Sequence, residues 1–240
     1  MLIQEGKEIN YKVKKAIIAI NSILLIIIIL FAPFSFYVFN FKFYEKLYER
    51  NDVYKTLDRN DVAILTTSVF NFLKYGEDFK RFELKNNLNY FTDNEISHLM
   101  DVKILFDKIL VLLYSSIILI IILTLFLLEK NILGFLRSIS SFFVIATSII
   151  IFLLVILYFL GNNFGSLFEN MHLVLFPGGN WAFPEGSLLI TMLPFGFFYD
   201  FFIRLLSTSF IISIIIIIIG IISLIFTGRQ RKWIEKKYKK

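Results

Sequence analysis

The sequence contains no cysteine, and it has only two histidines, four prolines and few charged residues. The absence of cysteine excludes disulfides, thiolate nucleophiles and thiolate metal ligands. Charged residues make up 18% of the 240 residues and hydrophobic residues 57%. A soluble domain has about a quarter of its residues charged, so this balance indicates an integral membrane protein.

Several short catalytic motifs are also missing from the sequence. It has no P-loop, no Gly-x-Gly-x-x-Gly turn, no Gly-x-Ser-x-Gly elbow and no His-Glu-x-x-His helix. These absences disfavour nucleotide binding, serine hydrolysis and zinc proteolysis. A divalent metal held by the two histidines with Glu95, Asp101 or Glu185 is a minor alternative, and we expect neither a metal nor a cofactor.

Four uncharged runs are long enough to cross a bilayer as helices: residues 16–39, 109–128, 138–160 and 205–227. About 20 apolar residues span a hydrocarbon core of about 30 Å, and a helix satisfies its own backbone hydrogen bonds there. The sequence therefore predicts an all-α membrane protein with four transmembrane helices. The first run is too long for the apolar region of a signal peptide, so we expect an uncleaved anchor that bends near Pro33.

Basic residues are concentrated beside these runs, in residues 1–15, 129–137 and 228–240. The positive-inside rule places all three segments in the cytoplasm, so residues 40–108 and 161–204 are expected on the outer face. Each basic cluster adjoins an apolar run, which favours contact with anionic lipid over binding of nucleic acid.

The first outer segment, residues 40–108, is predicted to be a small helical extracytoplasmic domain. Residues 60–75 have helical periodicity and are followed by Gly76, a typical helix stop. Residues 82–91 alternate loosely and suggest a short extended piece. Residues 92–95 (TDNE) fit a capping box, so a helix starting there is expected to continue into the second span.

The second outer segment, residues 161–204, is predicted to be a re-entrant or interfacial loop. Its part from 171 to 202 carries only two charges, Glu185 and Asp200, and is interrupted by prolines and glycines. Such a segment is too apolar for water and too broken for one spanning helix. Irregular backbone at membrane depth usually lines a cavity, so this segment is the predicted binding region.

Both histidines fall at the predicted outer interface. His98 follows the capping box, with Glu95 and Asp101 three residues to either side on one helical face, and His172 opens the broken loop. A carboxylate beside an imidazole orients the ring and stabilises its protonated form. The competing interpretation is that both histidines are ordinary interfacial residues that cap hydrogen bonds.

Two segments of the sequence, in the same order along the chain, resemble the signatures of the lipoprotein intramolecular transacylases, the Lit family. They are FTDNEISHLMDVK at residues 91–103, and HLVLFPGGNWAFP at residues 172–184 with residues 188–190 and Pro194 after it. The resemblance implies a bacterial cytoplasmic-membrane enzyme that moves the sn-2 acyl chain of a diacylglyceryl lipoprotein to the α-amino group of its N-terminal cysteine. It also implies that His98 and His172 are essential.

The chemistry of such a transfer suggests a role for each residue. We expect His98, oriented by Asp101 or Glu95, to be the base and His172 the acid, although the reverse is equally open. Backbone amides of the loop are candidates to hold the developing oxyanion, and other side chains of the outer face are candidates to contact substrate. The oxyanion and substrate candidates are Gly178, Gly179, Asn180, Trp181 and Arg204.

The expected partners are the diacylglyceryl lipoprotein substrate and membrane phospholipid, with no nucleic acid. The sequence leaves the oligomeric state open, a monomer included. Two other classes remain as alternatives: another acyltransferase that acts on membrane lipids, and a non-catalytic protein that senses the envelope or binds a partner.

Overall fold

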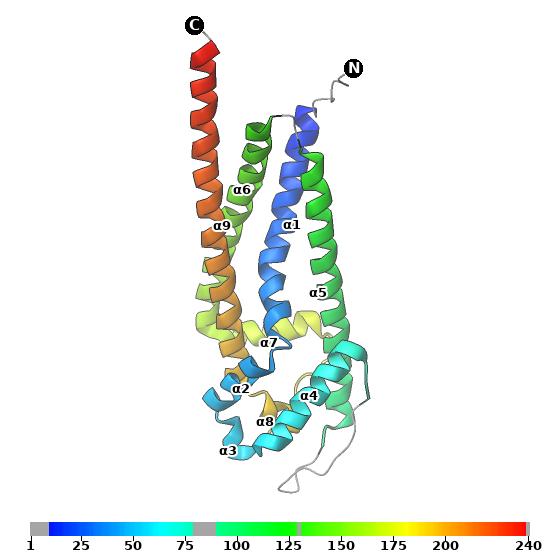
Figure 1. Cartoon of the computed structure of the whole chain (residues 1–240). Helices are drawn as coiled ribbons and strands as arrows, with labels where there is room; N and C mark the ends of the chain where they lie inside the picture. The colour runs from blue at the N-terminus through cyan, green and yellow to red at the C-terminus, as the bar shows by residue number, and fades with distance from the viewer. Residues whose placement is uncertain (1–9, 79–89, 129–130, 239–240) are drawn as a thin grey trace. The chain divides into compact units, whose positions relative to one another are not determined.

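The computed structural model describes residues 10–78, 90–128 and 131–238, and these residues form a succession of helices without a strand (Figure 1). The longest helices are α1 (Tyr11–Tyr37), α5 (Asp93–Phe126), α6 (Ile132–Leu160) and α9 (Phe195–Tyr238). The shorter ones are α2 (Phe41–Arg50), α3 (Val53–Thr56), α4 (Arg59–Tyr75), the 3-10 turn η2 (Gly161–Asn163), α7 (Phe164–Leu175) and α8 (Leu188–Met192). The predicted all-α fold is confirmed.

Helix α4 begins and ends where its capping residues require. The side chain of Asp58 accepts a hydrogen bond from the Asn60 amide at 2.9 Å, which satisfies one free N–H of the first turn. At the other end Gly76 has φ +70°, a left-handed conformation that glycine adopts without steric cost. The prediction of a helix over 60–75 that stops at Gly76 is confirmed within one residue.

Helix α5 begins at the predicted capping box. The hydroxyl of Thr92 accepts a hydrogen bond from the Glu95 amide at 3.3 Å, and the Glu95 carboxylate accepts one from the Thr92 amide at 2.7 Å. The helix then continues without a break from Asp93 to Phe126, so the predicted unbroken helix from the capping box into the apolar run at 109–128 is confirmed.

Other boundaries differ from the sequence-based expectation or lie beyond it. Helix α1 continues through Pro33 to Tyr37, and α9 starts at Phe195, ten residues before the apolar run that begins at 205. Of the extended piece expected over 82–91, residues 82–89 lie outside the described residues, as do 1–9 and 129–130 of the expected cytoplasmic segments.

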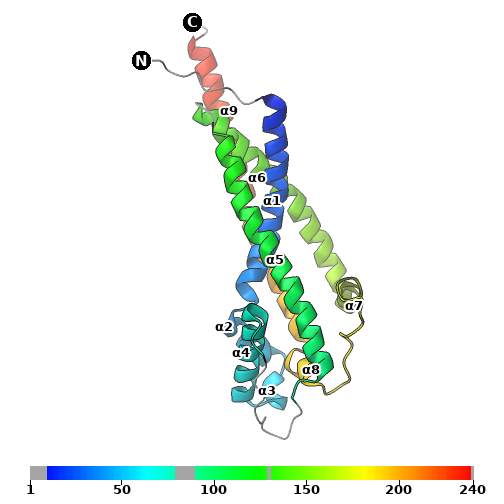
Figure 2. The same cartoon turned by 90° about the vertical axis from the view of Figure 1, so that its right-hand side faces the viewer.

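Within the described residues four helical stretches are long and apolar enough to cross a membrane, and they correspond to α1, α5, α6 continued into α7, and most of α9. Much of these helices belongs to one of the two compact units of the chain, which comprises Met1–Ala32, Leu112–Ile156 and Ser207–Lys240. In this unit the beginning of α1, the end of α5, the beginning of α6 and the end of α9 lie at the same end (Figures 1 and 2). This arrangement agrees with an even number of crossings.

Small and polar side chains join the helices within this unit. Asn21 of α1 donates to Thr124 of α5 at 3.2 Å, and Ser140 of α6 bonds Ser223 of α9 at 2.6 Å. A Cβ placed on Gly220 of α9 would lie 2.9 Å from Val144 Cγ2 of α6. Because lipid tails are as apolar as the side chains, close packing and interhelical hydrogen bonds hold such helices together.

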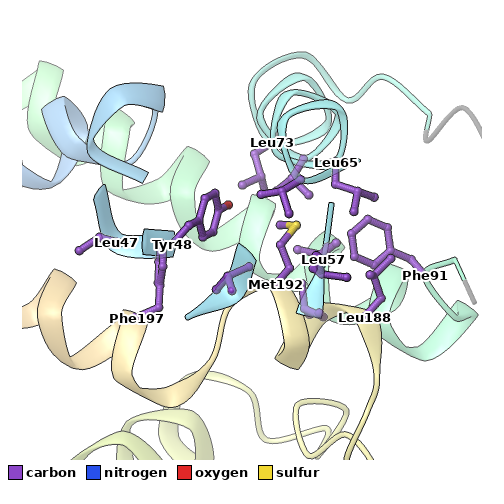
Figure 3. Close-up of a cluster of buried hydrophobic side chains, with 14 of the residues drawn as sticks. Leu47, Tyr48, Leu57, Leu65, Leu73, Phe91, Leu188, Met192 and Phe197 are labelled. Carbon is purple, nitrogen blue, oxygen red and sulfur yellow. The ribbon is translucent and has the colours of Figure 1, made fainter. Parts of the chain in front are cut away.

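The second compact unit comprises Pro33–Val111 and Leu157–Leu206, and it has a hydrophobic core of its own. The core is formed by α2, α3, α4, α8 and the first turns of α5 and α9 (Figure 3). Tyr48 is fully buried, stacks on Phe197 with ring centroids 5.6 Å apart, and its hydroxyl bonds Thr66 Oγ1 at 2.8 Å. Burial raises the pKa of the Tyr48 hydroxyl, so this group remains a neutral hydrogen-bonding partner.

Irregular backbone joins α7 to α8 in this unit, between Phe176 and Ser187. Two turns order it, closed by hydrogen bonds from the Gly179 amide to the Phe176 carbonyl and from the Ser187 amide to the Pro184 carbonyl, each 3.1 Å. Gly179 has φ +73°, which a residue with a Cβ rarely adopts. The expected loop is therefore shorter than 161–204, because α7, α8 and the start of α9 occupy much of that range.

Leu65→Ala should destabilise the protein by about 2–5 kcal/mol, because Leu65 is fully buried in the core of this unit and its loss leaves a cavity. Thermal unfolding in detergent measures the effect. The control is Ile64→Ala, one residue earlier on α4, where the side chain is 48% exposed. Equal losses of stability from both variants would contradict the described core.

Candidate functional site

The two histidines of the sequence lie beside each other in the second unit. His98 comes from the first turns of α5 and His172 from the last turn of α7, and their ring centroids are 6.1 Å apart with the planes 29° from parallel. Each residue is only 7% exposed. Burial opposes a positive charge on either ring, and the neighbouring imidazole opposes it further, so the pair accommodates one proton more readily than two.

The hydrogen bonding of His172 defines its tautomer. Its Nδ1 lies 2.8 Å from the backbone carbonyl oxygen of Phe168, one turn earlier on α7. A carbonyl oxygen only accepts, so Nδ1 carries the hydrogen and donates it. The neutral ring therefore has its lone pair on Nε2, which is the nitrogen able to accept a proton or to attack a carbonyl carbon.

Asn180 connects the irregular loop to α5 beside His98. Its amide nitrogen donates to Asp101 Oδ2 at 2.8 Å and to Ser97 Oγ at 3.3 Å. These two bonds fix the amide, and its Oδ1 is buried with no hydrogen-bond partner among the described residues. The Nδ1 of His98 is likewise buried and unpaired within the described residues, and Asn180 lies within reach of it. Asp101 thus contacts Asn180, which faces the histidine.

Glu95, the other acidic candidate beside His98, is buried and holds two helix N-termini by hydrogen bonds. It is 1% exposed, and its Oε2 accepts hydrogen bonds from the amide and hydroxyl of Thr92 at 2.7 and 2.9 Å. Its Oε1 accepts the amide of Leu189 at 2.7 Å, in the first turn of α8. A carboxylate is favourable at a helix N-terminus, and this one serves two. Its hydrogen bonds go to these two helix ends instead of to the His98 ring.

Aromatic rings surround the histidine pair. Phe176 and Phe183 lie 4.8 and 5.6 Å from His98, and Phe168 and Trp181 lie 4.1 and 5.0 Å from His172, measured between ring centroids. The irregular loop that carries three of these rings passes from α7 to α8 along the beginning of α5 (Figure 2). Such a shell reduces access of water and provides an apolar surface suited to an acyl chain.

The remaining candidates are exposed residues of the loop and of α9. Gly178 and Gly179 are exposed, and the Gly179 amide is used by the turn to Phe176. Arg204 is exposed on α9, and its guanidinium forms no ion pair within the described ranges. In the described part of the chain no group of three or more histidine, aspartate or glutamate side chains is placed to hold a metal.

Some residues of the site were not identified from the sequence. Phe168, whose carbonyl orients His172, stands one helical turn before it, and that spacing is visible once α7 is known to be a helix. Ser97 adjoins His98 in sequence, and its hydrogen bond with Asn180 depends on a contact between distant segments. Phe176 lies in the signature at 172–184 but carried no separate signal, because aromatic residues are abundant throughout the chain.

A sequence model of the family described as "Lipoprotein intramolecular transacylase Lit" matches residues 19–198, three quarters of the chain. The chain belongs to the Lit family. The predicted family resemblance is therefore confirmed, and this Lit-family chain is a multi-pass membrane protein.

Other comparisons agree with membership of the Lit family. A curated "Uncharacterized protein" of Aquifex aeolicus (strain VF5) is 31% identical over 150 residues, which are 61% of this chain and 63% of that protein. The chain thus matches less than two thirds of this relative's length.

Solved structures of the membrane integral Lit from Bacillus cereus have the same fold. One has a TM-score of 0.63 at 20% identity and covers 96% of this chain and 99% of its own. A variant with a histidine replaced by arginine gives 0.67 at 19% identity, covering 92% and 94%. A variant with a histidine replaced by alanine gives 0.68 at 20% identity, covering 90% and 96%.

Glu95→Ala should destabilise the second unit, because the buried Leu189 amide then has no acceptor, at a cost of about 1–3 kcal/mol. Hydrogen exchange should become faster in the peptide that contains α8, and mass spectrometry measures it. Asp93→Asn is the matched control, since Asp93 is an exposed acid in the same first turn of α5. Unchanged exchange in α8 after Glu95→Ala would refute this structural role.

Proposed function

We propose that this protein catalyses intramolecular acyl transfer in bacterial lipoproteins. The sn-2 acyl chain of the diacylglyceryl group moves to the α-amino group of the N-terminal cysteine, and the product is the lyso-form, an N-acyl S-monoacylglyceryl lipoprotein. The observation that carries the proposal is the pair of buried imidazoles 6.1 Å apart, both within the region matched by the Lit family.

The chemistry requires proton transfer in both directions. The α-amino group has an unperturbed pKa of about 7.7–8.0, so a large part of it is protonated near neutral pH and cannot attack. As the neutral amine attacks the ester carbonyl carbon, it must lose a proton, and the glycerol oxygen must gain one when the C–O bond breaks. One base that then becomes an acid keeps these protons in balance.

The tautomer of His172 favours this residue as the base, the reverse of the first assignment considered from the sequence. Its Nε2 lone pair accepts the proton of the attacking amine, and the resulting imidazolium returns that proton to the departing glycerol oxygen. His98 carries its hydrogen on Nδ1, toward Asn180, so its Nε2 serves as an acceptor that orients the attacking amine. The aromatic shell favours transfer to the amine over hydrolysis, because it limits water around the ester.

Asp101 and Asn180 are proposed as positioning residues for His98. Asp101 fixes the Asn180 amide through the bond to Nδ2, which leaves Oδ1 to accept a hydrogen bond from His98 Nδ1. Catalytic hydrogen bonds are often long or open in the absence of substrate and close when it binds. In this arrangement Asp101 acts on the imidazole through Asn180.

The proposed location is the bacterial cytoplasmic membrane, with both termini cytoplasmic and the histidine pair at the extracytoplasmic face. Basic residues at the two ends and between the second and third spans support this orientation. The proposed partners are the diacylglyceryl lipoprotein and the surrounding phospholipid.

Replacing either histidine by alanine should lower formation of the lyso-form by about 10²–10⁴-fold, because general acid–base assistance is lost. The test expresses each variant with a diacyl lipoprotein and analyses the N-terminal lipopeptide and the phospholipids by mass spectrometry. Asn94→Ala and Asn170→Ala are matched controls, since both residues are exposed on the same two helices. Full activity of the His172→Ala variant would contradict the proposed acid–base mechanism.

The same experiment distinguishes the other functional classes. Altered acyl chains in phospholipid with unmodified lipoprotein would indicate another lipid acyltransferase. A phenotype without an acylated product, insensitive to replacement of both histidines, would indicate a sensor or binding protein.

Asp101→Asn and Asn180→Ala should each reduce kcat by about 10–100-fold, as loss of an orienting residue typically does. The double variant should be no worse than the more affected single variant, because both act on His98 along one route. The pH–rate profile should shift in all three. Glu185→Gln, the same carboxylate-to-amide change at an exposed position of the loop, is the control. Additive losses with an unshifted profile would contradict the shared route.

A further inference from the structure

Trp181 has a buried hydrogen-bond donor without an acceptor. Its Nε1 is not accessible to solvent, and no partner for it is present in the described residues. An indole nitrogen can only donate, and buried tryptophan N–H groups are usually paired. The indole N–H is therefore available to an acceptor on a bound molecule.

The indole of Trp181 lies beside the imidazole of His172. Its ring centroid is 5.0 Å from that of His172, with 41° between the planes. The Nδ1 of His172 is engaged with Phe168, so the proton-accepting Nε2 is the free nitrogen of that ring. An ester held for attack beside His172 therefore lies next to the indole ring.

The backbone amides considered from the sequence are poorer donors for a developing oxyanion. The Gly179 amide already donates to the Phe176 carbonyl at 3.1 Å. Gly178 and Gly179 are both exposed, so water competes for any acceptor placed there. An oxyanion is stabilised most strongly by a donor in a site that excludes water, and Trp181 Nε1 is a buried donor.

We infer that the indole N–H of Trp181 binds the carbonyl oxygen of the migrating acyl chain and stabilises its negative charge in the tetrahedral intermediate. The amine nitrogen forms a bond to the carbonyl carbon, the oxygen gains charge under the indole N–H, and the C–O bond to glycerol then breaks. The indole keeps its proton throughout. This role rests on the proposed acyl transfer and names a catalytic residue for it.

Trp181→Phe tests the inference, since it retains an aromatic ring and deletes the donor. Lyso-form production should fall by about 10²–10³-fold in kcat, as for loss of one oxyanion donor, with KM within a few-fold of the parent value. Trp233→Phe is the matched control, because Trp233 is the other of the two tryptophans and is 60% exposed near the end of α9. It should keep full activity.

The outcomes separate the two proposals. An active parent protein with an equally active Trp181→Phe variant overturns the indole role and leaves the transfer intact. A raised KM with unchanged kcat also overturns it, since the ring then only grips the acyl chain. A parent protein that makes no lyso-form from a diacyl lipoprotein removes the proposed function itself.

A second variant guards against a packing defect in Trp181→Phe. Replacing Trp181 with 3-benzothienylalanine, whose sulfur takes the place of the N–H in a ring of similar shape, should give the same loss of kcat. Thermal unfolding should remain at the parent midpoint. Activity restored to the parent level by this residue would show that ring size, and not the donor, is what the reaction requires, and would overturn the inference.

Discussion

The buried carboxylate of Glu95 determines where the rest of the candidate site lies. One oxygen closes the capping box that starts α5, and the other holds the first turn of α8. Because both bonds come from one side chain, α5, which carries His98, and the first turn of α8 cannot separate without leaving the buried Leu189 amide and one oxygen of Glu95 unpaired. Asn180 makes a second connection between that loop and α5.

The aromatic shell and the tautomer of His172 address different parts of the same chemical problem. A membrane enzyme that transfers an acyl chain to an amine must place a base beside the amine and exclude water from the ester, which would otherwise be hydrolysed. The bond from Nδ1 to the Phe168 carbonyl leaves the opposite nitrogen available. The rings of Phe176 and Phe183 enclose the neighbouring histidine, so reactivity and protection are supplied by separate residues.

Features encoded by local sequence were predictable. Uncharged runs of sufficient length mark membrane helices, Gly76 marks the end of α4, and the capping box marks the beginning of α5, because each depends on residues within a few positions. The meeting of the two histidines could be anticipated only from two signatures that resemble one family, since it depends on how distant segments pack.

Other features could not be predicted because they arise from long-range contacts. The sequence places Glu95 and Asp101 symmetrically about His98, and helical geometry alone cannot distinguish them. Leu189, 94 residues farther along the chain, binds Glu95, and Asn180, 79 residues farther, binds Asp101. The regular structure within 161–204 was likewise concealed, because prolines and glycines interrupt the periodicity while short helices form between them.

The two imidazoles are held in unequal ways. His172 is oriented from within α7, by a carbonyl one turn away, and so retains its direction as long as that helix exists. The orientation of His98 depends on residues from the connection between α7 and α8, namely Asn180, Phe176 and Phe183. Substitutions in the connection between α7 and α8 therefore change the hydrogen-bonding surroundings of His98, whereas the hydrogen bond that orients His172 lies within α7.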